Sequence, residues 1–192
     1  MGVAKLQRLA ELRGEAAHQD NRFERTYLAM RPWLPEGVRD FLDIGCGRGV
    51  IAIWVARHYR TATAHLIDGV DERSHQVWHT DGVPWRDVNI ALRAFAKHCP
   101  EIAVKAWPPD PALTIPCELI YSNCSWGHHY PIETYLGLVH RSLKPGGTLI
   151  VDLRLGAPAE HGQALLDRHF NRAGTIESPG KKYLRTVWRS AA

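Results

Sequence analysis

The stretch FLDIGCGRGV, residues 41–50, decides the fold class of this chain. It begins as an apolar run broken only by Asp43, and three glycines then follow at alternate positions, Gly45, Gly47 and Gly49. Glycine loses more backbone entropy on folding than any other residue, so this spacing indicates a tight turn that a ligand or a neighbouring backbone approaches closely. We predict that a strand ends here, that a helix follows Gly49, and that a ligand binds between them at the carboxyl edge of a parallel sheet.

Short apolar runs alternate with helical segments from residue 41 to residue 154. TAHLID (63–68) and TLIVDLR (148–154) are typical of buried strands, and the segments around them carry apolar residues at helical spacing. Strands that alternate with helices form a parallel sheet with both faces covered. Two further strand-like runs surround Pro179 and Gly180 and predict a C-terminal hairpin with an antiparallel strand. The sequence therefore predicts an α/β fold.

The composition is that of one globular domain, with 45% hydrophobic and 23% charged residues in 192. The chain has no run of about 18 apolar residues and its N-terminus is charged, so we expect a cytoplasmic protein with no membrane partner. The four cysteines lack the CxxC spacing of zinc sites and are interpreted as free thiols. The formal charge of +4, without a block of like charges, permits nucleic-acid binding but does not indicate it.

Two segments are expected along the chain. Residues 1–32 form an N-terminal helical segment in which Leu6, Leu9 and Leu12 give one apolar face. This face covers the ligand site as a lid, packs on the sheet or meets a second copy, so a monomer and a homodimer are both open. Residues 33–192 form the ligand-binding domain.

Asp43, two residues ahead of the first glycine, restricts the kind of ligand. A dinucleotide-binding turn has the spacing GxGxxG and holds a pyrophosphate at the start of its helix, whereas this chain has GxGxG. A carboxylate at this position repels phosphate and attracts an amine. S-adenosylmethionine fits this description, because it carries an ammonium and a sulfonium but no phosphate.

Three features together resemble the class I S-adenosylmethionine-dependent methyltransferases. FLDIGCGRG matches their first motif, Asp68 ends the next strand 19 residues after Gly49, and SLKPGGTLIVD (142–152) matches the turn before their fifth strand. The resemblance covers about residues 33–154. It implies a doubly wound, mostly parallel seven-stranded sheet with helices on both faces, S-adenosylmethionine as the cofactor, and methyl transfer as the activity.

The resemblance also assigns cofactor-binding residues. Asp68 is expected to accept hydrogen bonds from both ribose hydroxyls, with Asp71 in that role if the strand runs longer. Asp110, in AWPPDP, is expected to accept one from the adenine amino group, and Asn123 to bind cofactor or substrate. Structural alternatives are that Asp68 caps a turn and that AWPPDP is a rigid connector. The predicted cofactor site comprises Asp43, Gly45, Cys46, Gly47, Gly49, Asp68, Asp110 and Asn123.

The segment IYSNCSWGHHYPIETY, residues 120–135, follows the fourth predicted strand and is the candidate acceptor site. His128 or His129 is the predicted base, because imidazole titrates near neutral pH. Tyr130, the third predicted catalytic residue, lines an apolar wall with Trp126. The alternative is structural: one histidine packs, the other is solvated, and Tyr130 sets the entry to the next helix.

Residues 69–85 are a second candidate cover for the site. His75 and His79 in this segment are spaced like a metal-binding pair, but no third ligand with suitable spacing follows, so no metal is predicted.

The predicted function is an enzyme, an S-adenosylmethionine-dependent methyltransferase that O-methylates a small hydroxylated molecule, such as a sugar or natural-product intermediate. SNCSW lacks the paired prolines of the [DNS]PP[YFW] tetrad that adenine and amide methylases of this superfamily often carry. A methyltransferase acting on nucleic acid or protein is one alternative. A non-catalytic binding subunit with the same fold is the other, although such a subunit has no need of Gly45, Gly47 and Asp68.

Overall fold

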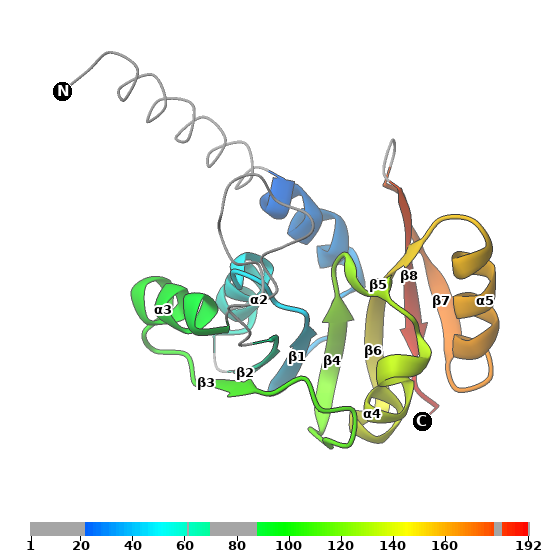
Figure 1. The fold of residues 1–192 in the computed structure, drawn as a ribbon. Coiled ribbons are helices and arrows are strands. Elements are labelled where there is room, and N and C mark those ends of the chain that lie inside the picture. The colour runs from blue at the N-terminus through cyan, green and yellow to red at the C-terminus, as the bar shows by residue number, and fades with distance from the viewer. Residues whose placement is uncertain (1–21, 61, 70–87, 179–181, 192) are drawn as a thin grey trace, which may run out of the picture.

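The computed structural model describes residues 22–60, 62–69, 88–178 and 182–191. A seven-stranded sheet crosses it in the order β3-β2-β1-β4-β6-β8-β7 (Figure 1). Its strands are β1 (Asp40–Ile44), β2 (Thr63–Ile67), β3 (Val104–Trp107), β4 (Cys117–Ser122), β6 (Leu143–Arg154), β7 (Asn171–Ile176) and β8 (Tyr183–Arg189). A further strand, β5 (Ser125–Tyr130), lies outside this order. The helices are η1 (Arg31–Trp33), α2 (Val50–Tyr59), α3 (Val88–His98), α4 (Glu133–Ser142), α5 (Ala157–Leu166) and residues 22–30.

The sheet is mostly parallel. β1 pairs in parallel with β2 and β4, β2 with β3, and β4 with β6, whereas β8 is antiparallel to both β6 and β7. The predicted α/β fold, with its seven-stranded sheet and antiparallel C-terminal hairpin, is confirmed. The tip of that hairpin, the predicted cover at 70–85 and the leucines of the N-terminal segment lie outside the described residues. Among the described helices, none has the length and apolar character needed to cross a membrane.

Helices cover both faces of the sheet, so the fold is doubly wound. One hydrophobic core lies between the sheet and helix 22–30, α2 and α3, on what we call the first face; the other core lies under α4 and α5. Successive residues of a strand point to opposite faces, and β1 accordingly gives Phe41 to the first core and Leu42 and Ile44 to the second. Asp43 therefore points to the first face, where it is buried.

The lysine of the LKPGG motif belongs to an ion network at the amino edge of the sheet. Lys144 Nζ lies 2.6 Å from Glu118 Oε1 and 3.6 Å from Asp40 Oδ2. Asp40 Oδ1 in turn pairs with His65 Nε2 at 3.1 Å, and His65 Nδ1 accepts a hydrogen bond from Trp107 Nε1 at 3.1 Å. Because Nδ1 accepts, the proton of the neutral imidazole is on Nε2, toward the carboxylate. The motif thus fastens β6 to β1 and β4 at the edge opposite the glycine turn.

We expect His65 to make stability depend on pH. Burial lowers the pKa of this imidazole, with Asp40 opposing and Lys105 and Lys144 adding to the decrease. The unfolded chain therefore binds more protons than the folded one below about pH 6.5, and the free energy of unfolding falls as the pH drops through this range. His65→Gln keeps hydrogen-bonding groups but does not titrate. Urea unfolding between pH 7 and pH 5 should show a shallower fall for this variant, with about 1 kcal/mol lost at pH 7.

The exposed His98 supplies the matched control, because His98→Gln removes a histidine that is solvated in the folded protein. A His65→Gln variant whose stability falls with pH as steeply as that of the wild type contradicts the assignment.

Candidate functional site

The glycine turn joins the carboxyl end of β1 to α2. Gly45, Gly47 and Gly49 all have positive φ angles, of 76°, 53° and 71°, in a region that residues with a side chain adopt only under strain. The N–H groups of Gly45 and Cys46 donate to the carbonyl of Ile67, at 2.8 and 3.2 Å, and tie the turn to β2. The predicted strand, turn and helix are all present.

Two of these glycines also make room for neighbouring side chains. A Cβ at Gly49 would lie 2.9 Å from the Cβ of Ala91 in α3, and one at Gly45 would lie 1.9 Å from Ser125 Oγ in β5. Any side chain at position 45 would therefore push β5 away from the turn. Sequence analysis predicted the turn at Gly45 but not this close approach of β5.

Asp68 follows β2 and lies against the glycine turn. Its Oδ2 accepts a hydrogen bond from Gly47 N at 2.6 Å, and its Oδ1 accepts one from Gly69 N at 2.7 Å. These two bonds fix the carboxylate, and each of its oxygens can accept more than one hydrogen bond. The geometry fits the predicted role toward two hydroxyls. Asp71, the alternative, lies outside the described residues.

Asp43 is 3% exposed and lies beside Tyr121 of β4 in the parallel register. Burial, and then the nearby Asp68 carboxylate, raises the pKa of Asp43 well above its usual range, while Tyr121 opposes the increase. The Tyr121 hydroxyl is buried and makes no well-formed hydrogen bond with any residue that the structure describes. Burial also raises the pKa of the Cys46 thiol, which is therefore neutral at physiological pH. A cationic ligand group at this turn would stabilise the ionised form of Asp43.

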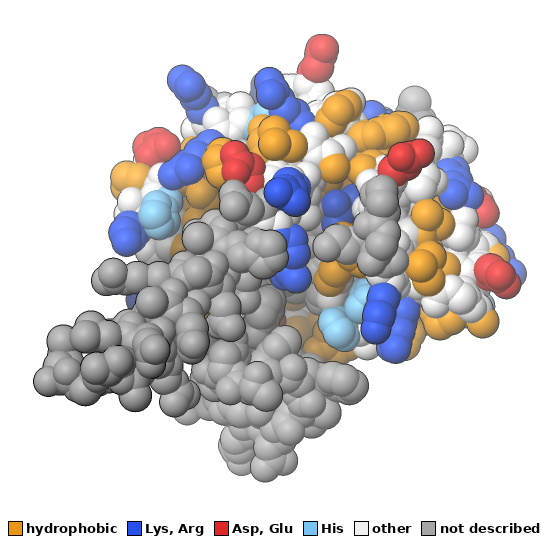
Figure 2. Space-filling model, turned by 90° about the horizontal axis from the view of Figure 1, so that it is seen from above, with side chains coloured by type: hydrophobic (Ala, Val, Ile, Leu, Met, Phe, Trp, Pro, Cys, Tyr) orange, Lys and Arg blue, Asp and Glu red, His pale blue; other side chains and the backbone are white. Residues whose placement is uncertain are grey.

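Polar side chains continue from the glycine turn along the carboxyl edge of the first face. Asn123, just past β4, shares a face with Tyr121 because the side chains alternate. Its Nδ2 lies 3.9 Å from Met30 Sδ in helix 22–30, and its buried Oδ1 has no hydrogen-bond partner among the described residues. Farther along, Asp152 of β6 lies opposite Arg185 of β8. Figure 2 looks onto this edge, with Lys and Arg side chains in the middle of the described surface.

β5 packs on β6 next to this row. Trp126 is fully buried, and it donates from its backbone N to Ser122 Oγ at 2.9 Å and from Nε1 to the carbonyl of Ile132 at 2.8 Å. Gly127 has a φ of 82°, and a Cβ there would lie 2.9 Å from the carbonyl oxygen of Asp152. The prediction that Trp126 lines the acceptor site was wrong, because its ring fills the core and anchors the strand.

The two predicted bases lie side by side on β5. His128 Nδ1 is buried and has no hydrogen-bond partner within the described ranges. The His128 ring centroid lies 4.6 Å from that of His129 and 6.2 Å from that of Tyr183. Burial lowers the pKa of His128, His129 and Arg154 add to the decrease, and Asp152 opposes it. The His128 imidazole is therefore neutral at pH 7.

Sequence analysis did not predict that Tyr183 would lie beside His128. The signal was present in YLRTVWR (β8), where Tyr183 and Arg185 occupy alternate positions and so share one face of the sheet. Their neighbours across the strand pair, Arg154 and Asp152, are also polar. The register of β6 against β8 was needed to show that these four residues are neighbours.

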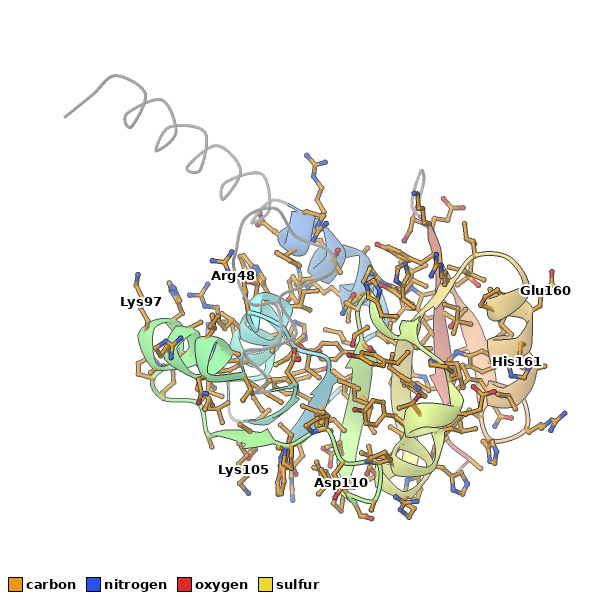
Figure 3. The ribbon with its side chains drawn as sticks, viewed as in Figure 1. Arg48, Lys97, Lys105, Asp110, Glu160 and His161 are labelled. Atoms are coloured by element: carbon orange, nitrogen blue, oxygen red, sulfur yellow. The ribbon has the colours of Figure 1, made fainter. Side chains whose placement is uncertain are left out.

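Two other predicted residues lie differently. Tyr130 ends β5 and is 38% exposed. Asp110 is exposed, and its Oδ1 accepts a hydrogen bond from Ala112 N at 2.8 Å, which caps the turn after β3. In Figure 3 Asp110 lies at the lower margin of the molecule, at the end opposite helix 22–30. Its role toward adenine and the catalytic role of Tyr130 stay predictions.

No group of three His, Cys, Asp or Glu side chains in the described part of the chain is placed to hold a metal ion. His75 and His79 lie outside that part. The four cysteines are free thiols, as the sequence indicated: Cys46, Cys99, Cys117 and Cys124.

Comparison with known proteins places the chain among methyltransferases. The methyltransferase domain family matches residues 11–190. The apo structure of SibL, an S-adenosylmethionine-dependent methyltransferase, superposes with a TM-score of 0.61 and 16% identity over 95% of this chain and 59% of its own. Mitomycin 7-O-methyltransferase MmcR gives 0.61 and 13% over 86% and 53%, and a methyltransferase from Pyrococcus furiosus gives 0.62 and 12% over 88% and 83%. No curated protein matches significantly.

The chain spans little more than half the length of the first two of these structures, at 59% and 53%. Together the comparisons identify S-adenosylmethionine as the cofactor. The residues of the glycine turn fit this cofactor. The fixed carboxylate of Asp68 is suited to hydroxyls, the buried acid Asp43 to an ammonium, and the buried Tyr121 hydroxyl beside it has hydrogen-bonding capacity left.

We expect cofactor binding to release a proton from Asp43. Its raised pKa favours the protonated acid in the free protein, and a cationic ligand lowers this pKa, so affinity should rise with pH. Calorimetry in buffers of different ionisation enthalpy measures the release. Asp43→Asn should remove it and weaken binding about 10- to 100-fold, as expected for a lost charged interaction.

Asp167→Asn, an exposed change of the same chemistry in the turn after α5, is the control and should leave both quantities unchanged. Wild-type affinity in Asp43→Asn, with the heat still dependent on the buffer, would remove Asp43 from the cofactor site.

Proposed function

The chain belongs to the methyltransferase domain family, and from this premise we propose that it methylates a hydroxyl oxygen of a small molecule, with His128 as the base. One observation carries the proposal. His128 Nδ1 is a buried nitrogen without a hydrogen-bond partner among the described residues, on an imidazole whose pKa is lowered. A group with these properties is suited to accept a proton from an acceptor hydroxyl at neutral pH.

S-adenosylmethionine supplies a methyl group activated by its sulfonium. The protein has to hold the acceptor in line with that group and to remove the hydroxyl proton as the oxygen becomes nucleophilic. We assign the second task to His128, which takes the proton on Nδ1 and returns it to water after turnover. The Asp152 carboxylate, which acts against the lowering of the His128 pKa, favours the imidazolium formed in this step.

Two further groups support a hydroxylated acceptor. The buried Asn123 Oδ1 offers an acceptor for a second hydroxyl of the substrate. His129 lies with its ring 4.6 Å from that of His128 and bounds the same site, as does the partly exposed Tyr130 at the end of β5. Neither His129 nor Tyr130 is needed as a second base.

Named structural neighbours agree with an acceptor of this class. MmcR is a mitomycin 7-O-methyltransferase, and an O-methyltransferase family 2 protein from Planctomyces limnophilus was solved in complex with apigenin. We therefore propose a sugar or natural-product intermediate as the acceptor. A polymer acceptor, nucleic acid or protein, has in its favour the basic side chains in the middle of the carboxyl edge (Figure 2).

A labelled-methyl incubation separates these acceptor classes. The protein is incubated with labelled cofactor and pooled small metabolites, RNA, DNA and protein, and the products are analysed by mass spectrometry. We expect label in a small molecule as an O-methyl group. Label found only in a polymer, or only on nitrogen, contradicts the proposal.

His128→Ala should lower kcat by about 10²- to 10⁴-fold, the usual contribution of a general base, while its affinity for S-adenosylhomocysteine stays within threefold of the wild type. His129→Ala should change kcat less than tenfold. In the wild type, kcat/KM should rise with pH through a pKa below 6.5 and then level off, and His128→Ala should lose this limb.

His161→Ala is the matched control, since this exposed histidine lies on α5 (Figure 3). A His128→Ala enzyme with the wild-type rate and pH profile shows that another group, or none, takes the proton.

A further inference from the structure

An ion pair between two strands is buried beneath the acceptor site. Asp152 of β6 and Arg185 of β8 are 0% and 2% exposed. Arg185 Nε donates to Asp152 Oδ1 at 2.7 Å, and its Nη2 donates to Oδ2 at 2.8 Å. Removing two charges from water is unfavourable, and an apolar pair of similar volume is often at least as stable. The stability of the sheet alone therefore does not account for this pair.

The first arm of the pair reaches the turn between β4 and β5. Asp152 Oδ2 accepts a hydrogen bond from Cys124 N at 3.1 Å, and Cys124 Sγ lies 3.5 Å from the same oxygen. Cys124 has a φ of 52°, and this left-handed conformation is strained for an L-residue with a side chain. The Asp152 carboxylate stabilises this conformation and thereby fixes the point from which β5 leaves the sheet.

The second arm reaches His128 from the side. Arg185 Nη2 donates to the Tyr183 hydroxyl at 3.3 Å, and Arg185 Cζ lies 5.2 Å from the centre of the Tyr183 ring. The Tyr183 and His128 rings are nearly perpendicular, at 79°, with their centroids 6.2 Å apart. One arm thus holds the start of the strand that carries His128, and the other holds the ring beside it.

We propose that the Asp152–Arg185 pair is a positioning device for the acceptor site, which holds the His128 imidazole in a fixed, partly buried place through Cys124 and Tyr183. The proposal rests on the proposed function of His128 as the base. Asp152 and Arg185 are positioning residues, because they act on His128 through other side chains and the backbone.

Two variants test the device. Asp152→Leu/Arg185→Met replaces the pair with apolar groups of similar size. Cys124→Gly/Tyr183→Phe leaves the ion pair in place, but it gives the turn the greater backbone freedom of glycine and removes the Tyr183 hydroxyl. We expect both to bind S-adenosylhomocysteine within threefold of the wild type, to lower kcat at least 30-fold on the acceptor found above, and to change KM less than threefold.

NMR titration of the His128 imidazole in the acceptor-free protein gives a readout that a merely structural role would not move. The charged and titratable groups that act on this ring are His129, Arg154, Asp152 and Tyr183. Cys124→Gly/Tyr183→Phe changes no charge at neutral pH, so a rise of the His128 pKa toward its ordinary value would report entry of water around the ring.

Ile150→Val is the matched control, because Ile150 lies two residues from Asp152 on the same face and is buried in the core of that face. It should lower stability without changing kcat or the His128 pKa. If Asp152→Leu/Arg185→Met does not fold, Cys124→Gly/Tyr183→Phe decides. A wild-type kcat and His128 pKa in that variant overturn the proposal. Two results together would overturn the assigned base but not the positioning: full activity of His128→Ala, and a shifted His128 pKa in Cys124→Gly/Tyr183→Phe.

Discussion

The contact between Gly45 and Ser125 couples the two halves of the site. A Cβ at position 45 would lie 1.9 Å from Ser125 Oγ, so only glycine allows β5 to approach the cofactor turn. The turn is tied to β2 through Ile67 and to Asp68 through Gly47. β5 is tied to the core through Trp126. Because both sides are fixed, the separation between the cofactor turn and the histidines is set by the fold.

The carboxyl edge of the first face is divided by charge. On the β1 side, the charge of Asp68 disfavours ionisation of the nearby Asp43. No cation among the described residues pairs with Asp43. On the β8 side, the Asp152 charge is already balanced by Arg185. A cationic cofactor is therefore favoured on the β1 side and a neutral acceptor group on the other. The two ligands of a methyl transfer to a hydroxyl differ in the same way, because the cofactor carries a sulfonium charge and the hydroxyl acceptor is neutral.

Sequence analysis predicted the cofactor half better than the acceptor half, for a physical reason. The glycine turn and Asp68 are local features whose spacing follows from one strand, one turn and one helix, and the structure places them together. The acceptor half depends on contacts between distant residues. Asp152 and Arg185 are 33 residues apart, and their pairing follows only from the register of β6 and β8.

Local sequence patterns also gave wrong expectations for the acceptor half of the site. The residues from Asn123 to Ser125 form a turn in which Cys124 has a positive φ, although cysteine has no preference for that conformation. Trp126 was expected in the acceptor site because it lies among polar residues in the sequence. Its indole N–H instead donates a hydrogen bond to the carbonyl of Ile132 in the core. Even LKPGG, which matched the family, acts at the opposite edge through Lys144.

The pairing of Asp152 also bears on how a histidine serves as a base beside a buried acid. A carboxylate near an imidazole raises its pKa, and a raised pKa makes the imidazole less available to accept a proton at neutral pH. Arg185 lies 2.7 Å from that carboxylate, and at a distance the field of a close ion pair is much weaker than that of a single charge. Burial, with His129 and Arg154, therefore lowers the pKa of the imidazole in spite of Asp152, and an oriented negative group remains near the proton that His128 is proposed to take up.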